Sequence, residues 1–235
     1  GYSSAASDVY KRQIWDCETL ARIGALCKQY DVIVVSDEIH CDLTKPGTEY
    51  IPFASVDDTC RDISVTCIAP TKTFNLAGLQ TAAVYAENSI LHHRMWRQLN
   101  TDEVAEPNAF AIQATIAAFQ YGEEWLDELR EYVEKNKQYV TEFLQEKIPL
   151  IHPVAGEATY LMWLDCRKIT ESGRQFAKFI RKTSGLYVSG GNQYGRGGEG
   201  FLRVNVATSK LVVEDGMQRL YESVDAWLKE EKISK

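Results

Sequence analysis

Two stretches of this sequence decide its fold: VIVVSDEIH at residues 32–40 and SVTCIAPTKTFN at residues 64–75. Each begins with a short apolar run, which is typical of a strand in a parallel sheet with both faces covered. Each run ends in a polar cluster, Ser36 to His40 in the first and Pro70 to Asn75 in the second. Ligands bind outside the carboxyl ends of strands in open parallel sheets, so we expect both clusters to face one site.

The residues around these runs predict an α/β protein. Apolar residues at helical spacing predict a helix that ends near Tyr30, and the run Val32–Val35 follows it directly. A helix followed by an apolar strand is typical of a parallel sheet with helices on its faces. Two further strands are predicted at 64–69 and 81–86.

Helical periodicity then dominates from about residue 89 to residue 148, with Pro107 and Gly122 as natural breaks. Residues 125–144 keep the spacing of one long amphipathic helix. After Pro149 the pattern changes, and it predicts in turn a strand, a helix, a strand and a helix at 159–164, 176–182, 201–206 and 213–229. This change indicates a domain boundary near residues 118–125.

Composition excludes several classes of function. Lys and Arg number 26 against 33 Asp and Glu, a net charge of −7, so nothing indicates nucleic-acid binding. The apolar runs are too short to cross a membrane, and no secretory signal is visible. The six cysteines form no CxxC pair and have no His at metal-ligand spacing, so we expect no metal site. We expect reduced structural thiols in a cytoplasmic protein, with a nucleophilic cysteine as the alternative.

Lys72 and Asp37 fit the needs of pyridoxal chemistry. A lysine amine must form a Schiff base with the cofactor aldehyde, and a carboxylate must keep the pyridine nitrogen protonated so that the ring withdraws electrons. The spacing alone favours the alternative, in which Lys72 is a surface residue and Asp37 is an ordinary acid at the end of a strand.

Three motifs make the prediction specific: SDEIH at 36–40, APTKTFNLAGLQ at 69–80 and EGFLRVNVA at 199–207. Together they resemble the pyridoxal-phosphate (PLP) enzymes of fold type I, the class I/II aminotransferase family, and more narrowly its MalY/PatB branch of cystathionine β-lyases. The resemblance covers residues 14–230. It implies a truncated large PLP-binding domain with a mainly parallel sheet at 14–120. A long linking helix and a smaller C-terminal α/β domain follow at 121–235, and 1–13 are an unrelated or disordered leader.

The resemblance also implies a role for each site residue. Lys72 binds the cofactor and later moves the substrate Cα proton, while Asp37 pairs with the pyridinium nitrogen. His40 stands where most of the family has a Tyr that contacts the phenolic oxygen, and its imidazole titrates near neutrality. Arg203 grips the substrate carboxylate. The alternatives are a satisfied polar residue at His40 and an internal salt bridge at Arg203.

The sequence departs from the family at the phosphate contacts. Many aminotransferases have Ser three residues before the lysine and Arg eight after it, where this chain has Ala69 and Gln80. Thr71 is the nearest replacement hydroxyl. The glycine-rich stretch Gly190–Gly200 precedes a predicted strand and not a helix, so we expect a flexible loop leading to Arg203 and not a phosphate cradle.

Family members are longer, and the family's Asn-Pro-x-Gly motif should stand just before Ile14, where residues 7–13 do not match it. We therefore expect the C-terminal portion of an enzyme, inactive by itself. The predicted activity is a carbon–sulfur β-lyase that converts a small sulfur-containing amino acid to a thiol, pyruvate and ammonia, as a homodimer when full length. The alternatives are a PLP-dependent aminotransferase and a non-catalytic fragment that binds no cofactor.

Overall fold

The computed structural model describes residues 14–233, and the leader predicted at 1–13 lies outside them. The described residues form two compact units. The first extends to Arg130, and the second begins at Glu131.

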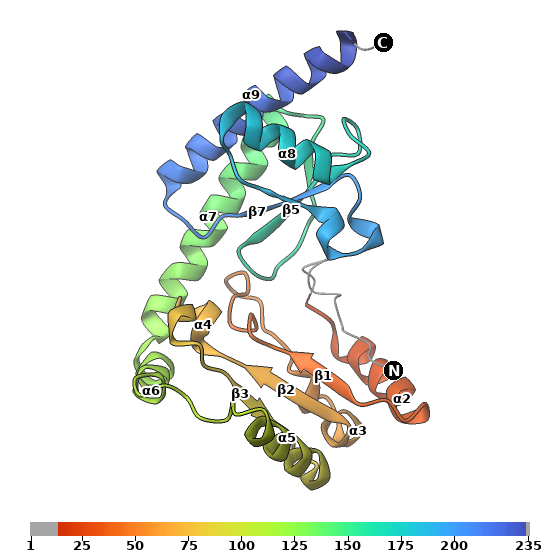
Figure 1. Cartoon of the computed structure of the whole chain (residues 1–235), viewed down its shortest axis with the longest axis vertical. Coiled ribbons are helices and arrows are strands. Elements are labelled where there is room, and N and C mark those ends of the chain that lie inside the picture. The colour runs from red at the N-terminus through yellow and green to blue at the C-terminus, as the bar shows by residue number, and fades with distance from the viewer. Residues whose placement is uncertain (1–13, 234–235) are drawn as a thin grey trace. The chain divides into compact units, whose positions relative to one another are not determined.

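The first unit contains a three-stranded sheet with the strand order β1-β2-β3 (Figure 1). Strand β1 pairs with β2 in parallel, and β2 pairs with β3 in antiparallel. The predicted α/β class is confirmed, and the sheet is mixed. In chain order the elements of this unit are α2 (Cys17–Gln29), β1 (Val34–Asp37), η1 (Phe53–Ser55), α3 (Asp58–Asp62), β2 (Ser64–Ile68), α4 (Pro70–Thr73), η2 (Ala77–Leu79), β3 (Ala83–Tyr85), α5 (Ser89–Thr101), α6 (Ala111–Tyr121) and the start of α7 (Glu123–Lys147), where η marks a 3₁₀ helix.

Strand β1 begins two residues later than the sequence predicts, because the residues just before it form the turn that ends α2. Asp31 adopts the left-handed conformation with φ 54°. The N–H of Val32 then donates to the carbonyl of Cys27 at 2.8 Å, so Val32 still belongs to the helix terminus. The first bond toward β2 comes from Val34, whose N–H donates to the carbonyl of Ile63 at 2.9 Å. Asp37 therefore lies inside the strand and not after it.

Helices cover parts of both faces of the sheet. On one face, Val34 packs with side chains from α2 and with buried Phe53, Cys60 and Ile63. On the other face, Val65 of β2 packs with Ala86 and with Leu91 of α5. The prediction of a fully covered strand is wrong for β1, because Val35 is 51% exposed. Among the described residues, β1 has a single neighbouring strand.

The two predicted breaks in the helical region are both present. Pro107 lies between α5 and α6, and Gly122 ends α6 just before α7 begins at Glu123. A Cβ atom at Gly122 would lie 2.4 Å from the carbonyl oxygen of Ala118 and 2.5 Å from the ring of Phe74, so this turn requires glycine. The long amphipathic helix expected at 125–144 is confirmed as part of α7.

The second unit contains a four-stranded sheet in the order β4-β5-β7-β6, and each neighbouring pair is antiparallel. The glycine-rich stretch from Gly190, predicted as one loop, contains two short 3₁₀ helices after β6. Besides the end of α7, the elements of this unit are β4 (His152–Pro153), β5 (Leu161–Asp165), α8 (Gly173–Ser184), β6 (Ser189–Gly190), η3 (Gly191–Tyr194), η4 (Arg196–Gly198), β7 (Phe201–Asn205) and α9 (Lys210–Ile233).

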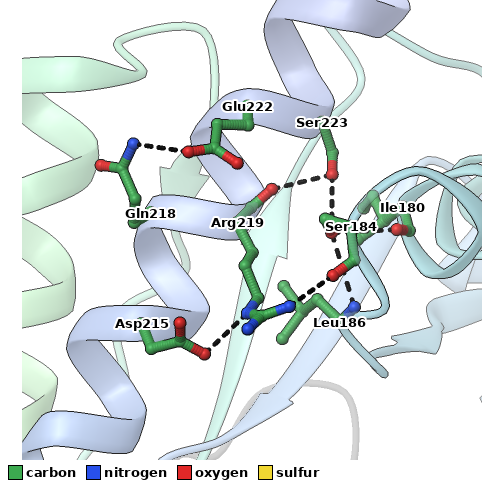
Figure 2. Close-up of polar contacts among 8 residues, drawn as sticks. All are labelled: Ile180, Ser184, Leu186, Asp215, Gln218, Arg219, Glu222 and Ser223. Atoms are coloured by element: carbon green, nitrogen blue, oxygen red, sulfur yellow. Dashed lines mark hydrogen bonds and ion pairs between the residues drawn. The ribbon is translucent and has the colours of Figure 1, made fainter.

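A polar network joins the C-terminal end of α8 to α9 (Figure 2). Arg219 of α9 donates through Nη1 to the carbonyl oxygen of Ser184 at 2.7 Å and through Nε to Asp215 at 2.7 Å. The hydroxyl of Ser223, which is fully buried, lies 2.9 Å from Oγ of Ser184. A cation here satisfies a carbonyl at the helix end, where the helix dipole is negative, and so stabilises the unit.

Within residues 14–233, no helix is both long and apolar enough to cross a bilayer.

Candidate functional site

Parallel pairing of β1 with β2 brings the two predicted polar clusters to one edge of the sheet. Asp37, the last residue of β1, stands opposite Cys67 of β2. The chain leaves β2 after Ile68 and enters the short helix α4, which carries Lys72. The main-chain hydrogen bonds of the two strands therefore place the Asp37 and Lys72 segments side by side, as the sequence predicts.

Lys72 is half-buried in α4. Within residues 14–233, its ammonium group has neither an ion-pair partner nor a hydrogen-bond partner. Lys28, by contrast, pairs with Asp62 at 2.8 Å on the surface. A partly buried amine at this end of the sheet that has no partner among the described residues is free to form a covalent bond with a ligand.

The carboxylate of Asp37 lies at the same edge. Its Oδ1 accepts a hydrogen bond from the N–H of Ile39 at 3.3 Å, which turns the chain away from the strand. Burial raises the pKa of the neighbouring Cys67 thiol, and the negative charges of Asp37 and Glu38 raise it further. The Asp37 side chain is exposed, so it can reach a ligand at this edge.

The turn that carries His40 is fixed to the end of β2. The N–H of Glu38 donates to the carbonyl of Cys67 at 2.8 Å, and the N–H of Leu43 donates to the carbonyl of His40 at 3.0 Å. The buried carboxylate of Glu38 accepts hydrogen bonds from the hydroxyl of Ser36 at 2.8 Å and from the N–H of Phe53 at 3.1 Å. His40 itself is half-buried in this turn.

A side-chain pair that the sequence analysis missed joins the two clusters directly. The hydroxyl of Thr73, which is fully buried, donates to Oδ2 of Asp42 at 2.9 Å. Thr73 follows Lys72, and Asp42 lies two residues after His40. The pair therefore fixes α4 against the turn. The polar character of both residues was visible in the sequence, but nothing in it indicated that residues 31 positions apart would pair.

The two positions at which the sequence departs from the family pattern, Ala69 and Gln80, lie on either side of Lys72 in the chain. Ala69 caps the N-terminus of α4 without a side-chain hydrogen bond, and Thr71 is half-buried in its first turn. Asn75 and Gln80 both adopt the left-handed conformation, with φ 54° and 49°. Such conformations cost free energy in residues other than glycine and are concentrated at functional sites.

Arg203 lies in the second unit, on β7, directly opposite Trp163 of β5 and Ser189 of β6. Its guanidinium carbon lies 4.2 Å from the ring centroid of Tyr194. In the part of the chain that the structure describes, no carboxylate pairs with Arg203 and no hydrogen bond uses its N–H groups. The internal salt bridge that was the alternative role of this residue is therefore absent from residues 14–233.

The cysteines are all free, and most are partly or fully buried. Burial, with a smaller contribution from the carboxylate of Asp42, raises the pKa of the Cys41 thiol to about 12. Burial and a hydrogen bond with Asp57 raise that of Cys60 to about 12. These thiols stay protonated near neutral pH, which does not favour a nucleophilic role. The described residues contain no group of His, Cys, Asp and Glu side chains able to hold a metal ion.

Comparison with known proteins identifies similar chains. The family model described as aminotransferase class I and II matches residues 13–220. Cystathionine β-lyase PatB of Bacillus subtilis is 40% identical over 206 residues, which is 88% of this chain and 53% of PatB. Protein MalY of Escherichia coli is 30% identical over 215 residues, covering 91% of this chain and 54% of MalY.

Among solved structures, the PLP-bound C–S lyase of Staphylococcus hominis superimposes with a TM-score of 0.81 at 33% identity. The match covers 91% of this chain and 55% of the lyase. The chain thus spans about half the length of the curated relatives that it matches.

Proposed function

We propose that this chain, which belongs to the aminotransferase class I and II family, carries part of the active site of a PLP-dependent carbon–sulfur β-lyase. One observation carries the proposal: the parallel pairing of β1 with β2 sets Asp37 and the unpaired Lys72 at one edge of the sheet. The similarity to PatB and to the C–S lyase of Staphylococcus hominis supports the choice of reaction.

The residues at the sheet edge suit the cofactor. When bound, PLP supplies an electron sink that makes the substrate Cα proton acidic. The amine of Lys72 would hold the cofactor covalently, and the free amine would accept the proton from the substrate Cα. The carboxylate of Asp37 keeps a proton on the pyridine nitrogen, because an anion beside that nitrogen favours its charged form.

Other residues orient the bound molecules. We assign the imidazole of His40 as a donor to the cofactor phenolic oxygen and the hydroxyl of Thr71 as a donor to the phosphate. In the second unit, Arg203 offers free, in-plane N–H groups that match a carboxylate in a bidentate geometry. The substrate is a small sulfur-containing amino acid that loses its thiol from Cβ, and water hydrolyses the remaining three-carbon fragment to pyruvate and ammonia.

We further propose that the full-length protein is a cytoplasmic homodimer and that the large PLP-binding domain includes residues 14–120. The small C-terminal domain then includes 121–235 with its linking helix. Six free cysteines, four of them with thiols whose pKa is raised, fit a reducing compartment.

The test of cofactor attachment is reduction with borohydride. We expect the full-length protein, loaded with PLP and then reduced, to carry the label on the peptide that contains Lys72, as read by mass spectrometry. Lys72→Ala should remove the label. Lys45→Ala is a matched control, because that lysine is exposed in a neighbouring loop, and it should keep the label. Label confined to Lys45 or Lys168 would contradict the assignment.

The reaction type needs a second measurement. A β-lyase releases pyruvate from cystathionine without any added keto acid, whereas an aminotransferase needs a keto acid to complete its cycle. If pyruvate is released only when a keto acid is present, the protein is an aminotransferase and the proposal of a lyase is wrong.

A further inference from the structure

The guanidinium of Arg203 is held by one aromatic face. Its Cζ atom lies 4.2 Å from the ring centroid of Tyr194, a distance at which a cation is attracted to the face of the ring. The N–H donors of a guanidinium all lie in its plane. No hydrogen bond among residues 14–233 uses these donors, so they remain available to a ligand while the ring contacts the cation.

Tyr194 is itself fixed by a buried tryptophan. Trp163, only 2% exposed, meets the Tyr194 ring edge to face, with centroids 5.5 Å apart and an interplanar angle of 77°. Trp163 also stands directly opposite Arg203 across the β5–β7 pair, so both side chains leave the same face of the sheet. Trp163, Tyr194 and Arg203 thus form a continuous column of contacts, with Tyr194 between the other two.

Close packing of the main chain keeps Tyr194 in this place. Tyr194 ends η3, which begins at Gly191. A Cβ atom at Gly191 would lie 2.6 Å from the Trp163 ring and 2.5 Å from the carbonyl oxygen of Gly198. The glycines of this stretch therefore allow η3 to lie directly on Trp163, and the one aromatic residue among them projects toward Arg203.

We propose that Tyr194 is a positioning residue that holds the guanidinium of Arg203 with its N–H edge ready for the substrate α-carboxylate. This inference rests on the proposed function, because Arg203 must be the carboxylate-binding residue. Arginine has a long, flexible side chain, and ordering it before the ligand arrives lowers the cost of binding. The ring affects a ligand that carries a carboxylate and should not affect an amine that lacks one.

The test uses the full-length holoenzyme and a ligand without an amine. Propionate, a simple carboxylate, should inhibit competitively with cystathionine, and n-propylamine serves as the ligand without a carboxylate. Tyr194→Leu removes the ring and should raise the inhibition constant of propionate by about 3- to 30-fold, the range expected for a cation–π contact. Tyr194→Phe keeps the ring and should change it by less than about 2-fold. Inhibition by n-propylamine should stay the same, and KM for cystathionine should rise while kcat holds.

Comparison of two variants distinguishes failure of this inference from failure of the proposed function. If Arg203→Ala abolishes inhibition by propionate while Tyr194→Leu leaves it unchanged, Arg203 keeps its role and the role of Tyr194 is overturned. If Arg203→Ala leaves inhibition by propionate unchanged, Arg203 does not bind the carboxylate. That part of the proposed function is then overturned, together with the inference that rests on it. Should Tyr194→Leu not fold, as judged by circular dichroism, Tyr194→Met fills the space without an aromatic face. Wild-type inhibition by propionate in that variant would equally overturn the inference.

Discussion

Thr73→Val removes the hydrogen bond that joins α4 to the turn after β1. The donor is fully buried and the acceptor is a half-buried carboxylate 2.9 Å away, so the bond is charge-assisted. Hydrogen bonds to charged groups contribute about 1.5–3 kcal/mol to folding. Water can partly replace the lost donor at half-buried Asp42, so we expect the free energy of unfolding to fall by about 1–2 kcal/mol.

A double-mutant cycle isolates this bond from the other effects of each substitution. Thr73→Val, Asp42→Ala and the double variant, made in the full-length protein, are unfolded in urea and their free energies compared. We expect a coupling energy of about 1–2 kcal/mol, as found for residues in one polar network. Thr141→Val is the control, because that hydroxyl donates to the carbonyl of Lys137 within its own helix. It should change stability by less than about 0.5 kcal/mol.

The same substitution should weaken the cofactor site, since Thr73 follows Lys72 in α4. A loss of 1.4 kcal/mol corresponds to about a tenfold change in an equilibrium constant. If the bond holds Lys72 in place, Thr73→Val should raise the dissociation constant of PLP by up to this order, as measured by cofactor absorbance during dialysis. A coupling energy below about 0.5 kcal/mol, with unchanged PLP affinity, would refute the reasoning.

Two further predictions concern packing and thiol chemistry. Gly173→Ala should destabilise the protein by about 1–3 kcal/mol in urea unfolding, because the new Cβ would lie 2.1 Å from the carbonyl oxygen of Phe201. Gly78→Ala, with no atom within 4 Å of its Cβ, is the matched control. In the folded protein at about pH 8, iodoacetamide should modify exposed Cys17 at least about tenfold faster than Cys60, whose burial and raised pKa of about 12 keep it protonated. Equal rates by mass spectrometry would show that Cys60 is accessible.

The sequence predicted those features that depend on local pattern. The long helix α7 follows from its apolar spacing, and the break before it follows from Gly122. The approach of Asp37 to the Lys72 segment follows from a general rule about the ends of parallel strands. The structure pairs Asp37 with Cys67 of β2 and places Lys72 in the helix α4 that follows this strand, while the roles of Lys72, Asp37, His40, Thr71 and Arg203 stay predictions.

Features that depend on particular long-range contacts could not be predicted. The start of β1 is set by the left-handed conformation of Asp31 and by the hydrogen bond from the N–H of Val32 to the carbonyl of Cys27. The pattern of apolar residues predicts neither feature. The Asp42–Thr73 bond links residues that only tertiary folding brings together. Tyr194 lies in a stretch whose glycine content predicts a loop, although a tyrosine among so many glycines was a visible signal.

The two groups of proposed site residues are held by different physical means, and this difference should decide which substitutions matter. Main-chain register between β1 and β2 sets Asp37 opposite Cys67, close in the chain to Lys72, and register depends on the apolar pattern of the whole strand and not on one polar side chain. Arg203 shares a strand pair with Trp163, but its guanidinium is oriented by the side chain of Tyr194. Side-chain orientation changes with a single substitution, whereas register changes only when a whole strand shifts. Substitutions near Arg203 should therefore alter substrate preference more readily than substitutions near β1 alter cofactor attachment.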